Sequence, residues 1–159
     1  MPLKKPVVLN TDGTFELLQA ADTLDIVVSA SDEATLTNSS AGAIAIGTPV
    51  YVSAANACQP SRANATGTAK VIGLVSATTI AGAATGTIRK DGTLTATTVQ
   101  WDAITGQTGG LTPGSSYFLS EAIVGRLTTT APVVGWVLPV GVALSTTDFE
   151  IQVGDRVRL

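Results

Sequence analysis

The sequence predicts an all-β protein: a small β-barrel or β-sandwich built from two similar halves, with an extended N-terminal arm. Short β-branched runs, the turn residues between them and an internal repeat point to this class. The best helix candidate, residues 16–21, is too short for a stable isolated helix. The expected strands are residues 7–9, 23–28, 34–37, 50–53, 70–76, 87–90, 93–100, 117–120, 126–129, 135–144 and 149–153.

The repeat is clearest around two glycines. Residues 73–79 (GLVSATT) align with residues 141–147 (GVALSTT), and in each copy a short strand and a Gly/Asp turn follow. Repeated units of this kind usually pack their apolar faces on one another. We therefore expect Gly73 and Gly141 at equivalent positions of two halves, which span about residues 44–92 and 111–159.

The chain divides at about residue 40. Residues 1–40 lie outside the repeat and are expected to form an N-terminal arm and edge element, and residues 41–159 the barrel or sandwich domain. Pro2 and Pro6 favour extended backbone in the arm. Within the domain, Asp91-Gly92 predicts a tight hairpin turn between two strands, because glycine tolerates positive φ.

Composition narrows the range of partners. The net charge of the chain is −3, its charged fraction is 13% and its hydrophobic fraction is 45%. The sequence has no basic cluster beyond Lys4-Lys5, so we expect no nucleic-acid binding. It has no apolar run long enough for a signal peptide or a membrane span, so we expect no membrane association. A surface poor in charge and rich in small residues suits packing against other subunits.

Chemistry-bearing residues are few. The chain has no histidine, which removes the commonest general base and most transition-metal sites. Its single cysteine, Cys58, lies in an expected polar loop, and Lys70 and Lys90 flank expected strands as solvated side chains. We expect no enzymatic activity, no catalytic residue, no metal site and no cofactor.

The large apolar side chains are therefore candidates for packing and binding. Trp101 and Trp136 are expected to be core anchors or interface residues. The arm is extended and carries unpaired backbone groups beside apolar residues, so it should seek a partner surface. The interface residues predicted in the arm are Leu3, Val7, Val8 and Leu9.

Four segments resemble a β-module that recurs in structural proteins of tailed bacteriophages: capsid decoration (head cement) proteins, head fibres and some tail-fibre segments. They are residues 99–106 (VQWDAITG), 110–120 (GLTPGSSYFLS), 125–132 (GRLTTTAP) and 140–147 (VGVALSTT). The resemblance covers about residues 44–153 and consists of turns and strands rather than site residues.

The resemblance implies a non-catalytic virion protein. The expected function is a decoration or cement protein that is made in the bacterial host cytoplasm, lies on the outer capsid surface and stabilises it. Its expected partners are the major capsid protein and further copies of itself, as a dimer or trimer. The alternative is a tail-fibre or receptor-binding module, in which Trp101 or Trp136 would be exposed for glycan contact.

Overall fold

The computed structural model describes residues 7–9, 15–17 and 33–159, with side chains described in the last of these ranges. The chain forms two compact units, Met1–Ala30 and Ser31–Leu159. The arm was expected to extend to residue 40. The larger unit begins earlier because residues 33–38 pair as a strand inside it.

The smaller unit contains an antiparallel hairpin of β1 (Val7–Leu9) and β2 (Phe15–Leu17). The strand predicted at residues 7–9 is confirmed. The helix candidate at residues 16–21 is wrong where it overlaps β2, because Glu16 pairs with Val8 in the ladder. The strand predicted at residues 23–28 lies outside the described residues.

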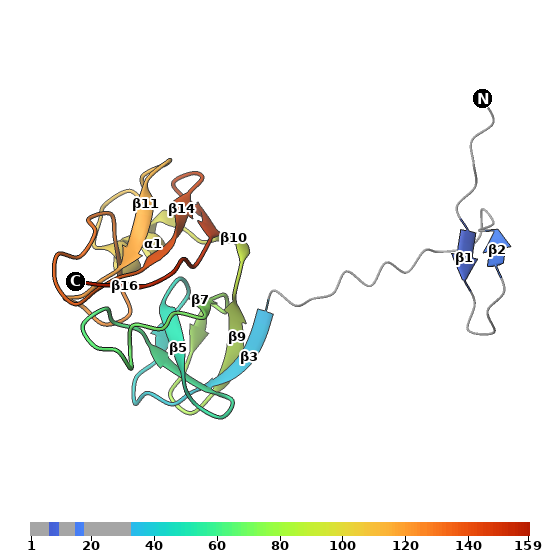
Figure 1. Ribbon diagram of the computed structural model, residues 1–159, viewed down its shortest axis with the longest axis horizontal. Coiled ribbons are helices and arrows are strands. Elements are labelled where there is room, and N and C mark those ends of the chain that lie inside the picture. The colour runs from blue at the N-terminus through green and yellow to red at the C-terminus, as the bar shows by residue number, and fades with distance from the viewer. Residues whose placement is uncertain (1–6, 10–14, 18–32) are drawn as a thin grey trace. The chain divides into compact units, whose positions relative to one another are not determined.

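The first half of the larger unit is a closed barrel with the strand order β3-β6-β5-β7-β9 (Figure 1). Its neighbours are antiparallel except for β3 and β6, whose parallel pairing closes the barrel. A small side sheet pairs β4 (Ile44–Ala45) with β8 (Thr79–Ile80). The barrel strands are β3 (Glu33–Asn38), β5 (Pro49–Ala54), β6 (Ala57–Pro60), β7 (Gly73–Val75) and β9 (Thr85–Arg89).

The second half is a five-stranded sheet with the order β10-β15-β14-β11-β12, and in Figure 1 it lies above the barrel. A separate ribbon pairs β13 (Trp136–Val137) with β16 (Val157–Arg158). In the described part of the chain, β10 and β12 do not pair with each other, so this sheet stays open. Its strands are β10 (Gly92–Thr95), β11 (Ser116–Leu119), β12 (Leu127–Thr128), β14 (Pro139–Ala143) and β15 (Asp148–Ile151).

The two halves have the same strand order once each is written from its first strand. Around the closed barrel from β3, the first half reads β3-β9-β7-β5-β6. The second half reads β10-β15-β14-β11-β12, so the strands correspond one to one in these orders. Gly73 pairs with Val50, and Gly141 pairs with Tyr117. A Cβ atom at either glycine would overlap a carbonyl oxygen of the next strand, that of Arg89 or of Glu150. The two glycines are therefore equivalent, as predicted, but the halves begin at β3 and β10 rather than at about residues 44 and 111.

One helix interrupts the strands of the larger unit, α1 (Thr98–Thr105), and it begins inside the strand predicted at residues 93–100. Thr97 and Gln100 form a capping box, in which each side chain bonds the other residue's backbone N–H. Gly106 ends the helix in the left-handed conformation, with φ 71°. The β-branched residues of this stretch favoured a strand, but the caps at both ends determine a helix.

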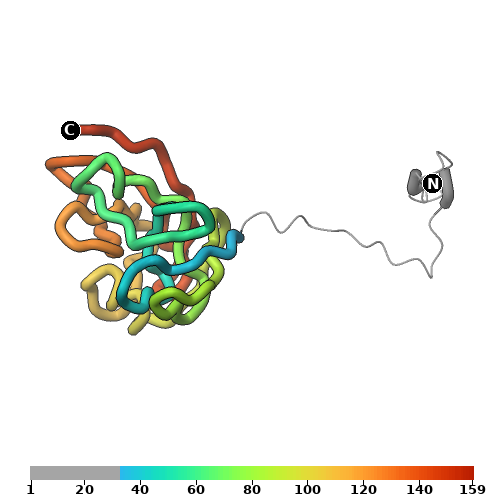
Figure 2. The backbone as a smooth tube through the Cα atoms, turned by 90° about the horizontal axis from the view of Figure 1, so that it is seen from below, coloured from blue at the N-terminus to red at the C-terminus, as the bar shows by residue number. Residues whose placement is uncertain are grey.

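Asp91-Gly92 is a crossover and not the predicted hairpin. Strand β9 pairs with β3 and β7, whereas β10 pairs with β15, so the two strands flanking this turn belong to different sheets. Gly92 does adopt a positive φ of 73°. Gly92 thus lies where the chain leaves the barrel strand β9 and enters β10 of the second half. Figure 2 shows the backbone path of the larger unit, coloured from blue in the first half to red at the C-terminus.

The larger unit has two core clusters, and the one centred on the second half also includes Ile46, Ala63, Val71 and Leu74 of the first half. An aromatic group lies in the second half, where the rings of Trp101 and Tyr117 each approach that of Phe149, with centroids 5.5 and 5.7 Å apart. The buried residues of the first core are aliphatic or small: Leu36, Ile44, Val50, Cys58, Val75, Ile80 and Ile88.

Candidate interaction surfaces

Cys58 was expected in a polar loop, but it lies in β6, where it is fully buried. Burial raises the pKa of its thiol, because the charged thiolate loses hydration there. The thiol therefore stays protonated and serves as a small core residue. Lys70 and Lys90 are exposed, as expected.

Two acidic side chains, those of Asp102 and Asp148, stabilise a loop and a turn through hydrogen bonds. Both oxygens of Asp102 accept hydrogen bonds from the amides of Gly109 and Gly110, at 3.2 and 2.7 Å, and hold the loop after α1. Asp148 accepts from Ser145 and Thr95 at 2.7 and 2.6 Å and closes the turn between β14 and β15. Among the described residues, no group of three or more Cys, Asp or Glu side chains is arranged to hold a metal ion.

Trp101 is a core residue and not an interface residue. Its side chain is fully buried, and its indole N–H donates to the carbonyl oxygen of Thr147 at 2.8 Å. The position in α1 explains this outcome, because a helix lying on the open sheet directs Trp101 and Ile104 into the core. Trp101 therefore has no surface to offer to a glycan.

Trp136 is partly buried and packs against the same core. The guanidinium of Arg156 lies over its ring, 4.9 Å from the centroid, in a cation–π arrangement. Arg156 also donates to the carbonyl oxygens of Thr66 and Ala69. Arg156 thereby holds the C-terminal segment against Trp136. The Trp136 side chain lies between chain segments and does not form an open binding surface.

The predicted arm residues fall on the smaller unit. Val7, Val8 and Leu9 form β1, whereas Leu3 lies outside the described residues. The arm was expected to be extended and unpaired. Instead, β1 pairs with β2 of the same chain, Val7 with Leu17 and Leu9 with Phe15.

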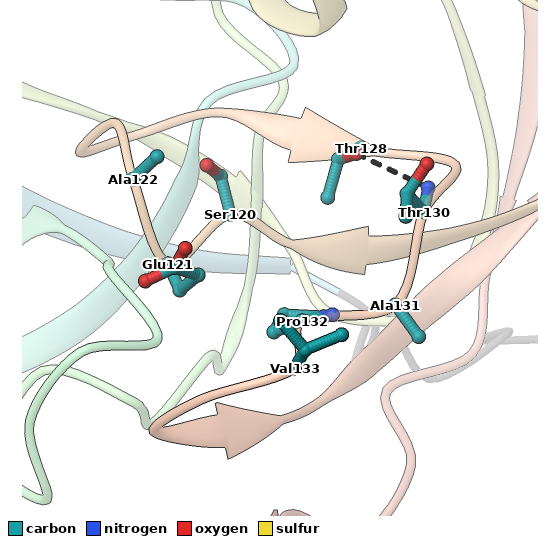
Figure 3. A pocket seen from close by; sticks show the side chains of 8 residues that line it. All are labelled: Ser120, Glu121, Ala122, Thr128, Thr130, Ala131, Pro132 and Val133. Atoms are coloured by element: carbon teal, nitrogen blue, oxygen red, sulfur yellow. Dashed lines mark hydrogen bonds between the residues drawn. The ribbon is translucent and has the colours of Figure 1, made fainter.

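Two loops of the second half expose large apolar side chains that the sequence analysis did not single out. The β11–β12 loop exposes Ile123 and Val124, and the β12–β13 loop exposes Val133 and Val134; Val133 is the most exposed, at 82%. A groove of about 220 Å³ separates the loops, with Glu121 and Ala122 on one side and Ala131 to Val133 on the other (Figure 3). Exposed apolar clusters of this kind mark interaction sites on soluble proteins.

Both loops are held at their bases by one short segment of the first half, residues 61–63. Ala63 donates to the carbonyl oxygen of Ser120 and accepts from the amide of Trp136, at 2.9 and 3.0 Å. Ser61 accepts from the amide of Gly125 at 2.8 Å. Arg62 donates through its Nε to the carbonyl oxygen of Glu121, also at 2.8 Å. These hydrogen bonds therefore fix the bases of the two loops that carry the exposed valines.

A second groove, of about 270 Å³, is also lined by the β11–β12 loop, through Val124, Gly125 and Arg126. Small or apolar residues in and next to β4, β6 and α1 complete it. The loop therefore borders two grooves that share no lining residue. Each groove has a single charged residue, Glu121 in the first and Arg126 in the second.

The sequence does carry a signal for these loops. Each contains two large aliphatic residues directly before a glycine, Ile-Val-Gly ending at Gly125 and Val-Val-Gly ending at Gly135. Both glycines have positive φ, 70° and 78°, so the chain turns sharply there and leaves the preceding residues outside the sheets. An aliphatic pair followed by a turn glycine resembles the end of a strand, which is why the surface was missed.

No protein-family model and no curated protein matches this chain. None of the helices among the described residues is long and apolar enough to span a membrane. The fold defines an all-β protein, and its candidate sites are apolar interaction surfaces.

Proposed function

We propose that this chain is a structural virion protein of a tailed bacteriophage, a decoration or cement protein that binds the outer capsid surface and stabilises it. The resemblance of residues 44–153 to the β-module of such proteins supports a virion role. The structural observation that carries the proposal is the separate N-terminal unit with its hairpin of β1 and β2.

Each strand of that hairpin has three residues, and an isolated two-stranded hairpin is at best marginally stable in water. Its register puts Val7, Leu9, Phe15 and Leu17 at positions on one side of the ribbon, and Val8 and Glu16 at positions on the other. A ribbon with this pattern gains stability when another protein covers its apolar side. A capsid subunit offers that cover, by packing or by extending the hairpin with a further strand.

In this role the protein acts by additive burial. The major capsid protein is the partner, and copies of the decoration protein that also contact one another bridge neighbouring capsomers. Specific interfaces bury about 1,200–2,000 Å² in total, so rupture of a decorated shell requires many such contacts to break together. The absence of histidine from the sequence and the protonated, buried thiol of Cys58 agree with a role without catalysis.

Two matched substitutions on β1 test the proposal. Leu9→Asp places a charge at a position on the apolar side of the hairpin, and Val8→Asp places the same charge on the opposite side. In binding assays with shells stripped of decoration, we expect Leu9→Asp to weaken attachment at least about tenfold, which corresponds to about 1.4 kcal/mol, and Val8→Asp to change it much less. Deletion of residues 1–10 should abolish attachment while the barrel unit melts as before. Equal binding by all four proteins contradicts the role of the hairpin.

The competing function is a tail-fibre or receptor-binding module. The burial of Trp101 leaves Trp136, beneath Arg156, as its remaining tryptophan for glycan contact. Copy number in purified virions separates the two functions. A decoration protein is expected at a copy number comparable with that of the major capsid protein, and a fibre module at a small fraction of it.

A further inference from the structure

The surface formed by the β11–β12 loop and its two grooves is suited to contact a second copy of itself. The loop exposes Ile123 and Val124, which are 50% and 56% exposed. The two grooves that it borders are lined mainly by small or apolar residues. Exposed apolar side chains beside a groove form a surface that a second, identical surface can complement.

The charges on this surface are also self-complementary. Glu121 lines one groove and Arg126 lines the other, so the acid and the base lie in different grooves. Within the part of the chain that the structure describes, the ion pair present is that of Glu33 with Arg89, so Glu121 and Arg126 have no ionic partner among these residues. When two copies meet through this surface with the acidic groove of one on the basic groove of the other, both charges find opposite partners.

We propose that this surface binds a second copy of the chain, with Ile123 and Val124 packed into a groove of the neighbour and Glu121 facing Arg126 of the next copy. The residues of the two grooves, together with Ile123 and Val134, reach the lower end of the about 20–30 residues that one side of a stable interface contributes. Both grooves are lined mainly by small or apolar residues, and interfaces between identical subunits are more apolar than transient ones.

This interface deepens the proposed function, because copies that hold one another link the capsid subunits beneath them. The proposed interface rests on that function for its biological purpose, but self-association itself does not require shell binding. Self-association is measured without shells, so failure of the interface and failure of shell binding are separate results.

The first test is sedimentation of the full-length chain over a range of concentrations. Wild type should associate, and Ile123→Asp and Val133→Asp should each weaken association at least about tenfold, because a charge must be desolvated in the contact. Val52→Asp is the matched control: Val52 is 50% exposed, as Ile123 is, but lies in β5 and lines neither groove. It should associate as wild type does. Thermal melts of each variant establish that the fold persists.

The second test exchanges the charges. Glu121→Arg and Arg126→Glu should each weaken association, and the double variant should recover most of it, because the pair is then restored between copies with its signs reversed. A loss of stability inside one chain changes the melting temperature but gives no such recovery of concentration-dependent association.

Several results overturn the proposal. A wild-type protein that stays monomeric at every concentration overturns it, and so does an Ile123→Asp variant that associates as strongly as wild type. An equal loss in Val52→Asp also contradicts it, since the effect is then general. If Ile123→Asp associates normally but no longer binds stripped shells, the surface belongs to the capsid contact and not to a second copy.

Discussion

The two halves of the larger unit share a strand order but bury their sheets in different ways. The first half closes on itself through the parallel pairing of β3 with β6 and fills its interior with aliphatic side chains. The second half stays open, and α1 supplies Trp101 to a core that also holds Tyr117 and Phe149. Strand order and closure are thus separate properties: the repeat determines the first, and the side chains determine the second.

Side-chain size gives the physical reason. The interior of a barrel narrows as its strands become fewer, and with five strands it has room for residues such as Val50 and Ile88. Tyr117 and Phe149 occupy the places equivalent to these two. Aromatic side chains of this size need a wider layer, which an open sheet covered by a helix provides.

The largest expected effect comes from the equivalent glycines. Gly141→Ala and Gly73→Ala should each reduce the free energy of unfolding by about 3 kcal/mol or more, because the added Cβ overlaps the carbonyl oxygen of Glu150 or Arg89 and the neighbouring backbone must move. Gly141→Ala should cost more, since its Cβ also lies 2.7 Å from the ring of Phe149. Urea unfolding measures both values.

Gly42→Ala and Gly67→Ala are the controls for these two substitutions. A Cβ at either position meets no atom within 4 Å, and neither residue has positive φ. Both variants should lie within about 1 kcal/mol of wild type, with either sign. A neutral Gly73→Ala beside a destabilising Gly141→Ala would show that the two halves do not share this packing.

The sequence allowed the fold class and the repeat to be predicted because both depend on local signals. The alternation of Leu94 and Ala96 with exposed threonines, and the two glycines before aliphatic residues, are visible in the chain itself. Whether β9 pairs with β10 or each joins another sheet is decided by contacts far along the chain, and the Asp91-Gly92 turn is compatible with both. The hairpin prediction failed for that reason.

The candidate site was less predictable. Trp101, which directly follows the predicted strand at residues 93–100, was expected to be a core anchor or an interface residue, and it is a core residue because the capping box of Thr97 and Gln100 starts a helix there. The exposed apolar loops depend on Gly125 and Gly135, whose positive φ turns the chain away from the sheets. Aliphatic residues alone do not reveal whether they end a strand or stand outside it.

Asn38 tests the closure of the first half. Its buried amide donates to the carbonyl oxygens of Gly42 and Ile80 at 2.8 and 3.0 Å and accepts from the amide of Ser40 at 2.9 Å. Asn38→Ala leaves these groups without partners and should reduce the free energy of unfolding by about 2–3 kcal/mol. The exposed Asn64 is the control, and Asn64→Ala should stay within about 0.5 kcal/mol of wild type in the same urea titration.

Thr97 tests the helix that distinguishes the second half. Thr97→Ala removes the side chain that accepts from the amide of Gln100 and should cost about 1 kcal/mol of stability, whereas Thr97→Ser should retain most of it. Thr108→Ala, an exposed threonine beyond the end of α1, is the control and should have little effect. If Thr97→Ser and Thr97→Ala destabilise equally in thermal melts, the loss comes from the missing methyl group and not from the cap.

The smallest expected effect concerns pH, and it too distinguishes the halves. Hydrogen bonds from Ser145 and then Thr95 and Thr147 lower the pKa of Asp148 below its ordinary value. At the equivalent place in the first half, Thr87 pairs with Thr35 and has no charge. Because the folded state favours the charged form of Asp148, its contribution to stability is present above the unfolded pKa of about 3.9 and is lost as the pH falls through the lower folded value.

We expect the difference in urea midpoint between wild type and Asp148→Asn to be largest near about pH 6 and to shrink towards about pH 3. Because the two proteins differ only at residue 148, this difference isolates the contribution of Asp148. A difference that stays constant over this range would mean that the charge of Asp148 contributes nothing and that the turn between β14 and β15 depends on neutral hydrogen bonds alone.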